Sequence, residues 1–241
     1  MSGDVPTLDV RNLKTHFFTK AGVARAVDGV SFSVGKGEVV GLVGESGSGK
    51  SVTGFSIIGL VDPPGRVVSG EVLFNGQNLI GLSPEKMRKL RGNRIAMIFQ
   101  DPMMTLNPVL RVDTQMVETI RAHDSSISKR DALARARDAL GQVGIPAPDE
   151  RLRSYPHQFS GGMRQRVVIA LALCAEPELV IADEPTTALD VSIQAQILNL
   201  MLDIKARMGL SMVFVSHDLS VVSHVSDRVA VMYLGRIVET G

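Results

Sequence analysis

The chain has 241 residues, with 26 Lys and Arg against 25 Asp and Glu, and a net charge of +1. This balance, without a cluster of basic residues, argues against nucleic acid as a partner, and the length suits one α/β domain with an appended subdomain. A single cysteine excludes disulfides and cysteine metal clusters within the chain, and its longest strongly apolar run is too short to span a bilayer.

Apolar and polar residues alternate over much of the first hundred positions, as they do in strands with one buried face. The alternation predicts strands at 7–18, 27–34, 67–68, 72–74 and 95–99. A turn over 19–22 joins the first two strands, an Asn75-Gly76 turn follows the fourth, and a polar helix is expected over 84–91. Phe17 lies at the end of the first strand. Its ring has two interpretations, a stacking surface for a nucleotide base or an ordinary core or edge residue.

Residues 44–51 read Gly-Glu-Ser-Gly-Ser-Gly-Lys-Ser and fit the phosphate-binding loop G-x-x-x-x-G-K-[ST]. An apolar strand over 38–43 precedes the loop and a helix over 52–60 follows it, which is the context that the motif requires. The glycines let backbone N–H groups turn inward, and the helix N-terminus adds partial positive charge. We expect Lys50 to reach the β- and γ-phosphates and Ser51 to ligate Mg²⁺. The alternative is a Gly/Ser-rich turn with an exposed lysine. The nucleotide-binding residues predicted here are Gly44, Glu45, Ser46, Gly47, Ser48, Gly49, Lys50, Ser51 and Val52.

After residue 100 the spacing of apolar residues changes from strand-like to helical. Helical spacing predicts helices at 112–123, 129–143 and 162–175, and sheet-like sequence returns at 179–182, 211–215, 228–233 and 236–238, with a helix over 191–208. We therefore predict a single α/β domain over 1–241 with the P-loop NTPase fold. It would have a mostly parallel sheet core, an N-terminal antiparallel β subdomain and an inserted α-helical subdomain. Residues 1–100 and 177–241 would form the nucleotide-binding core, and about 101–176 the insert.

Asp183 and Glu184 follow the apolar strand 179–182. In a parallel sheet, ligands collect at the carboxyl ends of the strands, where the phosphate-binding loop also lies. We expect Asp183 to hold Mg²⁺, through water, and Glu184 to polarise the water that attacks the γ-phosphate. The alternative is a pair of strand-end acids that cap the next helix.

His217 and Gln100 also follow predicted strands. A lone histidine is more often structural, but the position of His217 directly after strand 211–215 places it at the same edge of the sheet, near the γ-phosphate. Gln100 is expected to contact Mg²⁺ or the attacking water with its amide. For Gln100 the alternative is an ordinary exposed polar residue.

A second phosphate-seeking surface is predicted at Ser160, Gly161 and Gly162, where a serine and two glycines begin a helix. Because this surface belongs to the helical insert, one nucleotide does not need it together with the loop at 44–51. We expect it to serve the nucleotide of a second subunit. The alternative is a serine N-cap without a ligand.

With these motifs in order along its whole length, the sequence resembles the ATP-binding cassette (ABC) ATPases. Residues 44–51 resemble the family's Walker A motif, and 179–183 its Walker B motif. Glu184 resembles the catalytic glutamate, Gln100 the Q-loop glutamine and His217 the switch histidine. Phe17 stands where the family places the aromatic residue that stacks on adenine. The resemblance implies ATP and Mg²⁺ as ligands, with Ser51, Gln100 and Asp183 holding the metal and Glu184, His217 and Gln100 acting in hydrolysis.

The resemblance also implies residues that contact the ATP of a partner. Ser160-Gly161-Gly162 resembles the signature motif, and Ala188-Leu189-Asp190 the D-loop. These matches imply contacts from Ser160, Gly161, Gly162 and Asp190 to the partner's nucleotide, so that two subunits pair head to tail around two ATP molecules. Met163 departs from the family pattern, because it stands where a glutamine is usual and lacks the amide.

Longer sequence segments, such as 99–103 and 182–191, resemble those of the importers of di- and oligopeptides. Nickel and glutathione importers have much of the same sequence in these segments. The implied partners are a second ABC ATPase subunit, either a copy of this chain or a different one, two transmembrane permease subunits and, indirectly, an extracytoplasmic substrate-binding protein, with no nucleic acid. The implied location is peripheral, on the cytoplasmic side of the inner membrane. An alternative of another class is a non-transport ABC ATPase of DNA repair or chromosome maintenance. The 133 positions from Lys50 to Asp183 hold no sustained heptads, which argues against it.

Overall fold

The structure is a computed structural model that describes residues 5–187 and 189–241. Its larger sheet has six strands: β3 (Val39–Val43), β6 (Ile95–Ile98), β7 (Leu179–Asp183), β8 (Ser211–Ser216), β9 (Arg228–Tyr233) and β10 (Arg236–Thr240). They lie in the order β10-β9-β3-β8-β7-β6, and all are parallel except β10, which pairs antiparallel with β9. The predicted parallel core is therefore confirmed.

The central strands are buried on both faces, which explains their unbroken apolar sequence. In β7, Ile181 faces one apolar cluster and Val180 the other. Strand β8 alternates in the same way, with Val213 on the first side and Phe214 on the second. Helices or a second sheet must therefore cover both faces of this sheet.

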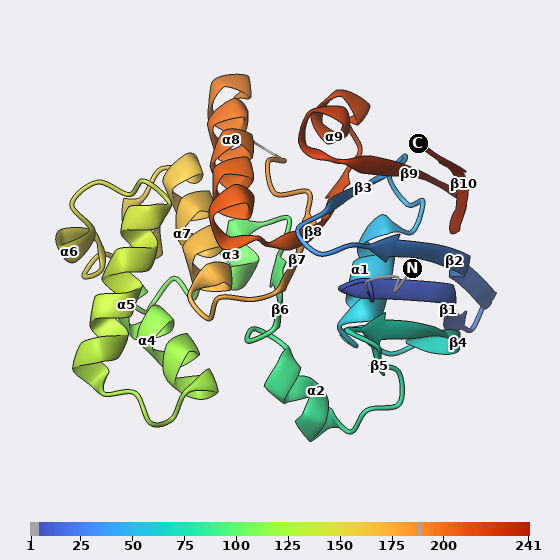
Figure 1. The fold of residues 1–241 in the computed structure, drawn as a ribbon, viewed down its shortest axis with the longest axis horizontal. Coiled ribbons are helices and arrows are strands. Elements are labelled where there is room, and N and C mark those ends of the chain that lie inside the picture. Colours follow the sequence, from blue (N-terminus) through green and yellow to red (C-terminus); the bar gives the residue numbers. More distant parts are fainter. Residues whose placement is uncertain (1–4, 188) are drawn as a thin grey trace.

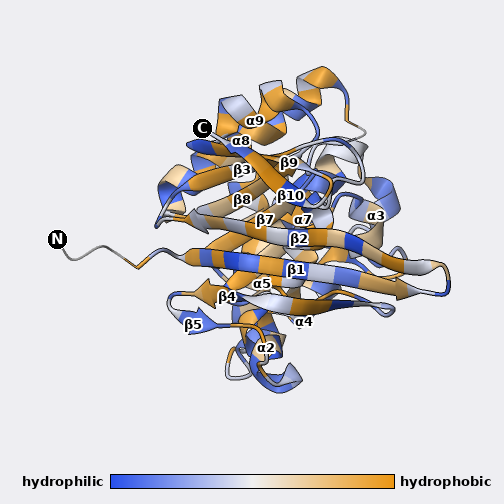
Figure 2. Ribbon diagram, turned by 90° about the vertical axis from the view of Figure 1, so that its right-hand side faces the viewer, coloured by the Kyte–Doolittle hydropathy of each residue, from blue (hydrophilic) through white to orange (hydrophobic). Residues whose placement is uncertain are grey.

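An antiparallel sheet of four strands covers one side, and it crosses the front of Figure 2. Its strands are β1 (Leu8–Thr19), β2 (Gly22–Val34), β4 (Gly65–Phe74) and β5 (Gln77–Asn78), in the order β2-β1-β4-β5. Helix α1 (Lys50–Ile57) contacts β1, β2 and β4 of this sheet as well as β7 of the larger one. The phosphate-binding loop thus leads into a helix held between two sheets.

Two predicted strand boundaries in this sheet were wrong. The segments 67–68 and 72–74 belong to one strand, β4, because Gly70 has a φ of +104° and lies against the backbone of β1, where a Cβ would come within 2.6 Å of Leu13 Cα. The register between β1 and β4 shifts at this point, as in a β-bulge. Strand β2 begins at Gly22 rather than residue 27; of its extra residues, 22–25 are exposed and Ala26 is half-buried.

The helices between β6 and β7 gather to one side of the molecule, coloured green to gold in Figure 1. Helices α4 (Val112–His123), α5 (Lys129–Gln142) and α7 (Gly161–Leu173) match the predictions closely. The sequence did not indicate the short helices α3 (Pro102–Thr105) and α6 (Pro148–Arg151) or the 3₁₀ turn η1 (Pro156–Gln158). The remaining helices are α2 (Pro84–Leu90), α8 (Val191–Met208) and α9 (Leu219–Val225).

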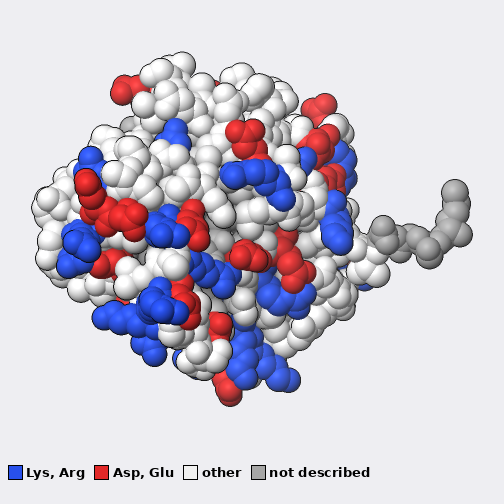
Figure 3. All heavy atoms as spheres, turned by 60° about the vertical axis from the view of Figure 1, so that its left-hand side comes forward, with Lys and Arg blue, Asp and Glu red and all other residues white. Residues whose placement is uncertain are grey.

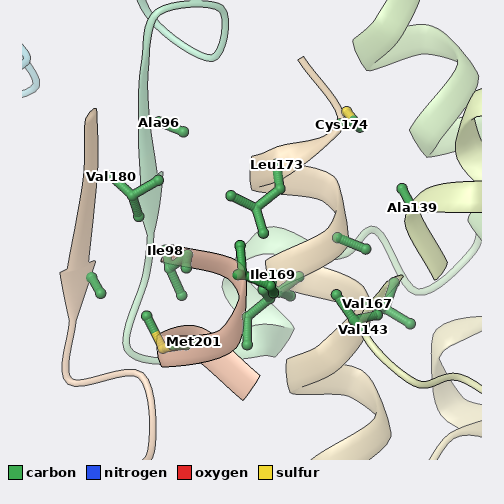
Figure 4. Close-up of a cluster of buried hydrophobic side chains, with 14 of the residues drawn as sticks. Ala96, Ile98, Ala139, Val143, Val167, Ile169, Leu173, Cys174, Val180 and Met201 are labelled. Atoms are coloured by element: carbon green, nitrogen blue, oxygen red, sulfur yellow. The ribbon is translucent and has the colours of Figure 1, made fainter. Parts of the chain in front are cut away.

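Helix α7 joins the helical side of the molecule to the sheet. Figure 4 shows Ile169 and Leu173 of α7 between Ile98 and Val180 of the sheet on one side and Ala139 of α5 on the other. All five side chains belong to one continuous apolar cluster. In the described part of the chain, no helix is long and apolar enough to cross a membrane.

Candidate functional site

The loop at 44–51 connects β3 to α1, and two of its glycines are required by close approach of the backbone. Gly49 has a φ of +104°, and a Cβ there would lie 2.2 Å from the carbonyl oxygen of Ala26. A Cβ on Gly44 would lie 2.2 Å from the carbonyl oxygen of Met232. Any other residue at these positions would push the loop away from β2 and β9. The loop is therefore shaped by its neighbours before any ligand arrives.

Lys50 is buried with its ammonium inside the loop. Its Nζ donates to the carbonyl oxygens of Gly44 at 2.7 Å and Glu45 at 2.8 Å, and the residue is 4% exposed. Burial lowers the pKa of Lys50, and the nearby carboxylates of Glu184 and Asp183 oppose that shift. A phosphate chain that supplies oxygen acceptors would replace the two carbonyls and compensate the buried charge.

Asp183 ends β7 next to the start of α1. Its Oδ1 accepts a hydrogen bond from Ser51 Oγ at 2.9 Å, and the residue is 3% exposed. Burial raises the pKa of Asp183, and the Ser51 hydrogen bond opposes the shift. A hydroxyl and a carboxylate in contact are hard oxygen donors of the kind that Mg²⁺ takes alongside phosphate oxygens and water, so the pair fits the cation. Among the described residues there is no cluster of three His, Cys, Asp or Glu that would hold a metal without a nucleotide.

The three residues predicted to act in hydrolysis meet at one oxygen atom. Glu184 Oε2 accepts from Gln100 Nε2 at 3.0 Å, and His217 Nδ1 lies 3.2 Å from the same oxygen. Thr187 Oγ1 also donates to it, at 2.9 Å. Glu184 has a φ of +46°, a conformation that costs energy for a residue with a side chain. Such strain at the centre of a polar cluster is typical of a functional site.

These residues surround a hollow of about 640 Å³ at the carboxyl ends of the parallel strands. It is lined by Ala26, Glu45, Ser46, Gly47, Gly49, Lys50, Ser51, Val52, Gln100, Glu184, Thr187 and His217. Sequence reasoning missed Ala26 and Thr187. The spacing of Thr187, three residues after Glu184, was a usable signal, because a turn at that distance returns the hydroxyl to the carboxylate, and Thr187 N indeed donates to the Glu184 carbonyl oxygen at 3.1 Å.

Phe17 lies outside the residues that line this hollow. It pairs with Ala24 and Gly65 across the antiparallel sheet, and its ring covers Gly65, where a Cβ would come within 2.6 Å of Phe17 Cε1. The ring is half-buried. Its role as a stacking surface for adenine stays a prediction.

The predicted partner-facing residues are also outside the hollow. Ser160 is the N-cap of α7, and its Oγ accepts from Met163 N at 3.4 Å, so the capping interpretation holds within this chain. Asp190 is exposed at the start of α8 without a side-chain cap hydrogen bond. Ala188 of the predicted D-loop lies outside the described residues. Contacts of Ser160, Gly161, Gly162 and Asp190 to a partner's nucleotide stay predictions.

A larger hollow, of about 870 Å³, lies at the opposite edge of the sheet, next to the first residues of β7 and β8. None of the predicted site residues lines it. Its charged residues are of both signs, including Lys36, Arg135, Asp131 and Asp138. Figure 3 shows the same mixture of acidic and basic side chains over the helical side of the molecule, without a patch of one sign on that face. We assign the chemistry to the smaller hollow, because Lys50, Ser51 and Glu184 line it and Asp183 contacts Ser51.

Comparisons with known proteins find similar sequences and a similar fold. The family model of the ABC transporters matches residues 27–187. The chain is 55% identical to a probable peptide ABC transporter ATP-binding protein, y4tR, of Sinorhizobium fredii, over 96% of this chain and 69% of that relative. It is 54% identical to the oligopeptide transport ATP-binding protein OppD of Bacillus subtilis, over 97% of this chain and 65% of the relative. The chain thus spans about two thirds of these curated relatives.

A solved structure is similar over almost the whole chain. The dimeric ABC transporter cassette MJ0796 superposes with a TM-score of 0.86 at 26% identity, covering 97% of each chain. A post-hydrolysis dimer of the same cassette, bound to ADP and Pi, gives the same TM-score and identity.

Proposed function

Because the chain belongs to the ABC transporter family, we propose that it is the ATP-hydrolysing subunit of an importer that takes up di- and oligopeptides. The chain binds ATP with Mg²⁺ and is an ATPase, like the cassettes that it resembles. The observation that carries the proposal is the convergence of Gln100, Thr187 and His217 on Glu184 Oε2, beside a buried phosphate-binding lysine. A protein that only binds nucleotide has no need of an oriented carboxylate at that place.

The residues at the hollow have separate roles in phosphoryl transfer. Lys50 and the backbone amides of the loop would hold the β- and γ-phosphates, and Ser51, Asp183 and Gln100 would hold Mg²⁺, which would neutralise phosphate charge when bound. Glu184 accepts a proton from the water that attacks the γ-phosphorus, and the bond to the β–γ bridging oxygen breaks to give ADP and phosphate. His217 orients the carboxylate, since its ring contacts the same oxygen at 3.2 Å.

We propose that two cassettes pair head to tail. Ser160, Gly161, Gly162 and Asp190 of one subunit would then complete the nucleotide site of the other. The separation of these four residues from the hollow of their own chain supports this arrangement, because a second chain is needed to bring them to a nucleotide. In this scheme residues 101–176 form the inserted helical subdomain. ATP binding closes the pair, and hydrolysis reopens it.

The permease subunits would dock beside Gln100, on the segment 101–110. Apolar side chains are exposed there, with Met104 at 83% and Val109 at 76% of their full accessibility. Exposed apolar side chains grouped on one segment favour a protein contact. We place the subunit on the cytoplasmic face of the inner membrane, held by its permease, which would receive cargo from an extracytoplasmic substrate-binding protein.

Peptides are the cargo that the names of the relatives favour. No particular observation favours nickel, glutathione or DNA repair over this choice.

The experiment that tests the proposal is Glu184→Gln in the purified chain. We expect ATP still to bind, phosphate release to fall by about 10²–10⁴-fold, and an ATP-dependent dimer to accumulate, because the base is lost while the phosphate contacts remain. Light scattering and a phosphate-release assay measure the two effects. A variant that hydrolyses ATP at the wild-type rate would refute the role of Glu184, and the absence of a dimer with ATP would refute the head-to-tail arrangement.

A further inference from the structure

The two glycines that begin α7 have different surroundings. A Cβ built on Gly162 would lie 2.6 Å from Ile193 Cγ2, which is closer than such carbons approach in real structures. A Cβ on Gly161 would meet only Leu189 Cδ2, at an ordinary 3.7 Å, and Gly161 is exposed. Neither glycine has a positive φ. Within this chain, packing therefore requires a glycine at 162 but not at 161.

Ile193 lies in the first turn of α8, three residues after the N-cap Asp190. The side chain is half-buried and packs against the apolar cluster that contains α7 and the sheet. One turn further along both helices, Arg166 Nη2 donates to Gln196 Oε1 at 3.3 Å. The N-terminal turns of α7 and α8 are thus held together at two successive levels, and Figure 1 shows the two helices side by side.

We propose that Ile193 is a positioning residue for the partner-facing half-site. By filling the space left by the missing Cβ of Gly162, it fixes Ser160–Gly162 relative to Asp190, so that all four residues meet the partner's nucleotide as one rigid surface. This inference rests on the proposed head-to-tail pairing. It adds that Gly162 is a glycine because of a contact within its own subunit, in addition to any approach to a nucleotide.

The test uses the full chain carrying Glu184→Gln, so that ATP-dependent dimers accumulate and are measured by sedimentation. Gly162→Ala should weaken dimerisation by at least about tenfold, because its methyl group collides with Ile193 Cγ2. Adding Ile193→Ala removes that carbon and should restore dimerisation to within about threefold of the Ile193→Ala variant alone. Without ATP, the unfolding temperature should likewise fall in Gly162→Ala and recover in the double variant to near that of Ile193→Ala alone, because the collision is within one chain.

Two matched controls separate this contact from a collision with the nucleotide. Adding Ile193→Val in place of Ile193→Ala keeps a methyl group at the Cγ2 position, and it should not rescue Gly162→Ala. Gly161→Ala meets no atom of its own chain closely, so any loss of dimerisation there should not be rescued by Ile193→Ala, and its unfolding temperature should not fall.

The outcomes are distinguishable. Rescue by Ile193→Ala and not by Ile193→Val supports the inference. The inference is overturned if the Gly162→Ala/Ile193→Ala variant is folded but remains monomeric, or if Gly162→Ala dimerises as well as its parent. In either case the dimer of the Glu184→Gln parent still supports the proposed pairing. A parent that remains monomeric with ATP overturns the pairing, and the role of Ile193 with it.

Discussion

Thr187 offers a sharp test of how the carboxylate of Glu184 is held. Its hydroxyl donates to Glu184 Oε2 at 2.9 Å, and the Glu184 side chain is only 13% exposed, so water does not easily replace this donor. Thr187→Val has nearly the same shape and removes the hydrogen bond. Hydrogen bonds to charged groups contribute about 1.5–3 kcal/mol. Because Gln100 and His217 also contact the same oxygen, we take the lower end of that range.

A loss of about 1.5 kcal/mol in the orientation of the base corresponds to a roughly tenfold lower kcat. The KM for ATP should change little, since Thr187 directs its hydroxyl to Glu184 and the phosphate contacts of the loop remain. Steady-state phosphate release against ATP concentration separates the two parameters. Thr187→Ser keeps the hydroxyl and should retain most of the activity. A kcat for Thr187→Val within about twofold of the Thr187→Ser value would refute the reasoning, and so would a loss confined to KM.

Three further outcomes are expected. Lys50→Ala removes the buried ammonium, and scanning fluorimetry should show that ATP no longer raises the unfolding temperature. Gly49→Ala should abolish ATP binding, because it combines a positive φ with a collision against β2, whereas Gly47→Ala, which has a positive φ but no atom within 4 Å of its Cβ, should only weaken binding; calorimetric titration compares them. Glu38→Gln should lower the free energy of unfolding by about 1 kcal/mol at pH 7, because the hydrogen bond from Arg228 holds the pKa of Glu38 below its usual range. A depressed pKa stabilises the fold above the pKa of the unfolded side chain, so urea titrations should show this difference vanishing as the pH falls through the folded pKa.

Local sequence was sufficient to predict the elements whose apolar and polar residues follow a strong periodic pattern or a motif. The phosphate-binding loop, the acids at the end of β7 and the long helices α4 and α8 were predicted within a residue or two, because each depends on its own periodicity and its own flanking residues. The same holds for placing Gln100, Glu184 and His217 at one edge of the sheet, since parallel strands bring their carboxyl ends together.

Contacts between segments far apart in the chain could not be predicted from local sequence patterns. The continuity of β4 depends on Gly70 lying against β1, and short helices such as α3 have too few residues to show a period. Gly44 and Gly49 were read from the sequence as phosphate-binding glycines, but their closest neighbours are carbonyl oxygens of β9 and β2. No pattern within residues 44–51 contains that information.

The sequence by itself indicated which chemistry this protein performs, because the residue types and their order along the chain specify a phosphate-binding loop and predict a cation site and a base. Only the tertiary structure decided how those groups are held. It directs two hydrogen-bond donors, Gln100 and Thr187, and the ring of His217 to one oxygen of Glu184, and it places Ile193 in the space left by Gly162. The physical reason is that hydrogen-bond partners and close packing are set by the distances between elements far apart in the chain, which a local pattern of residue types does not encode.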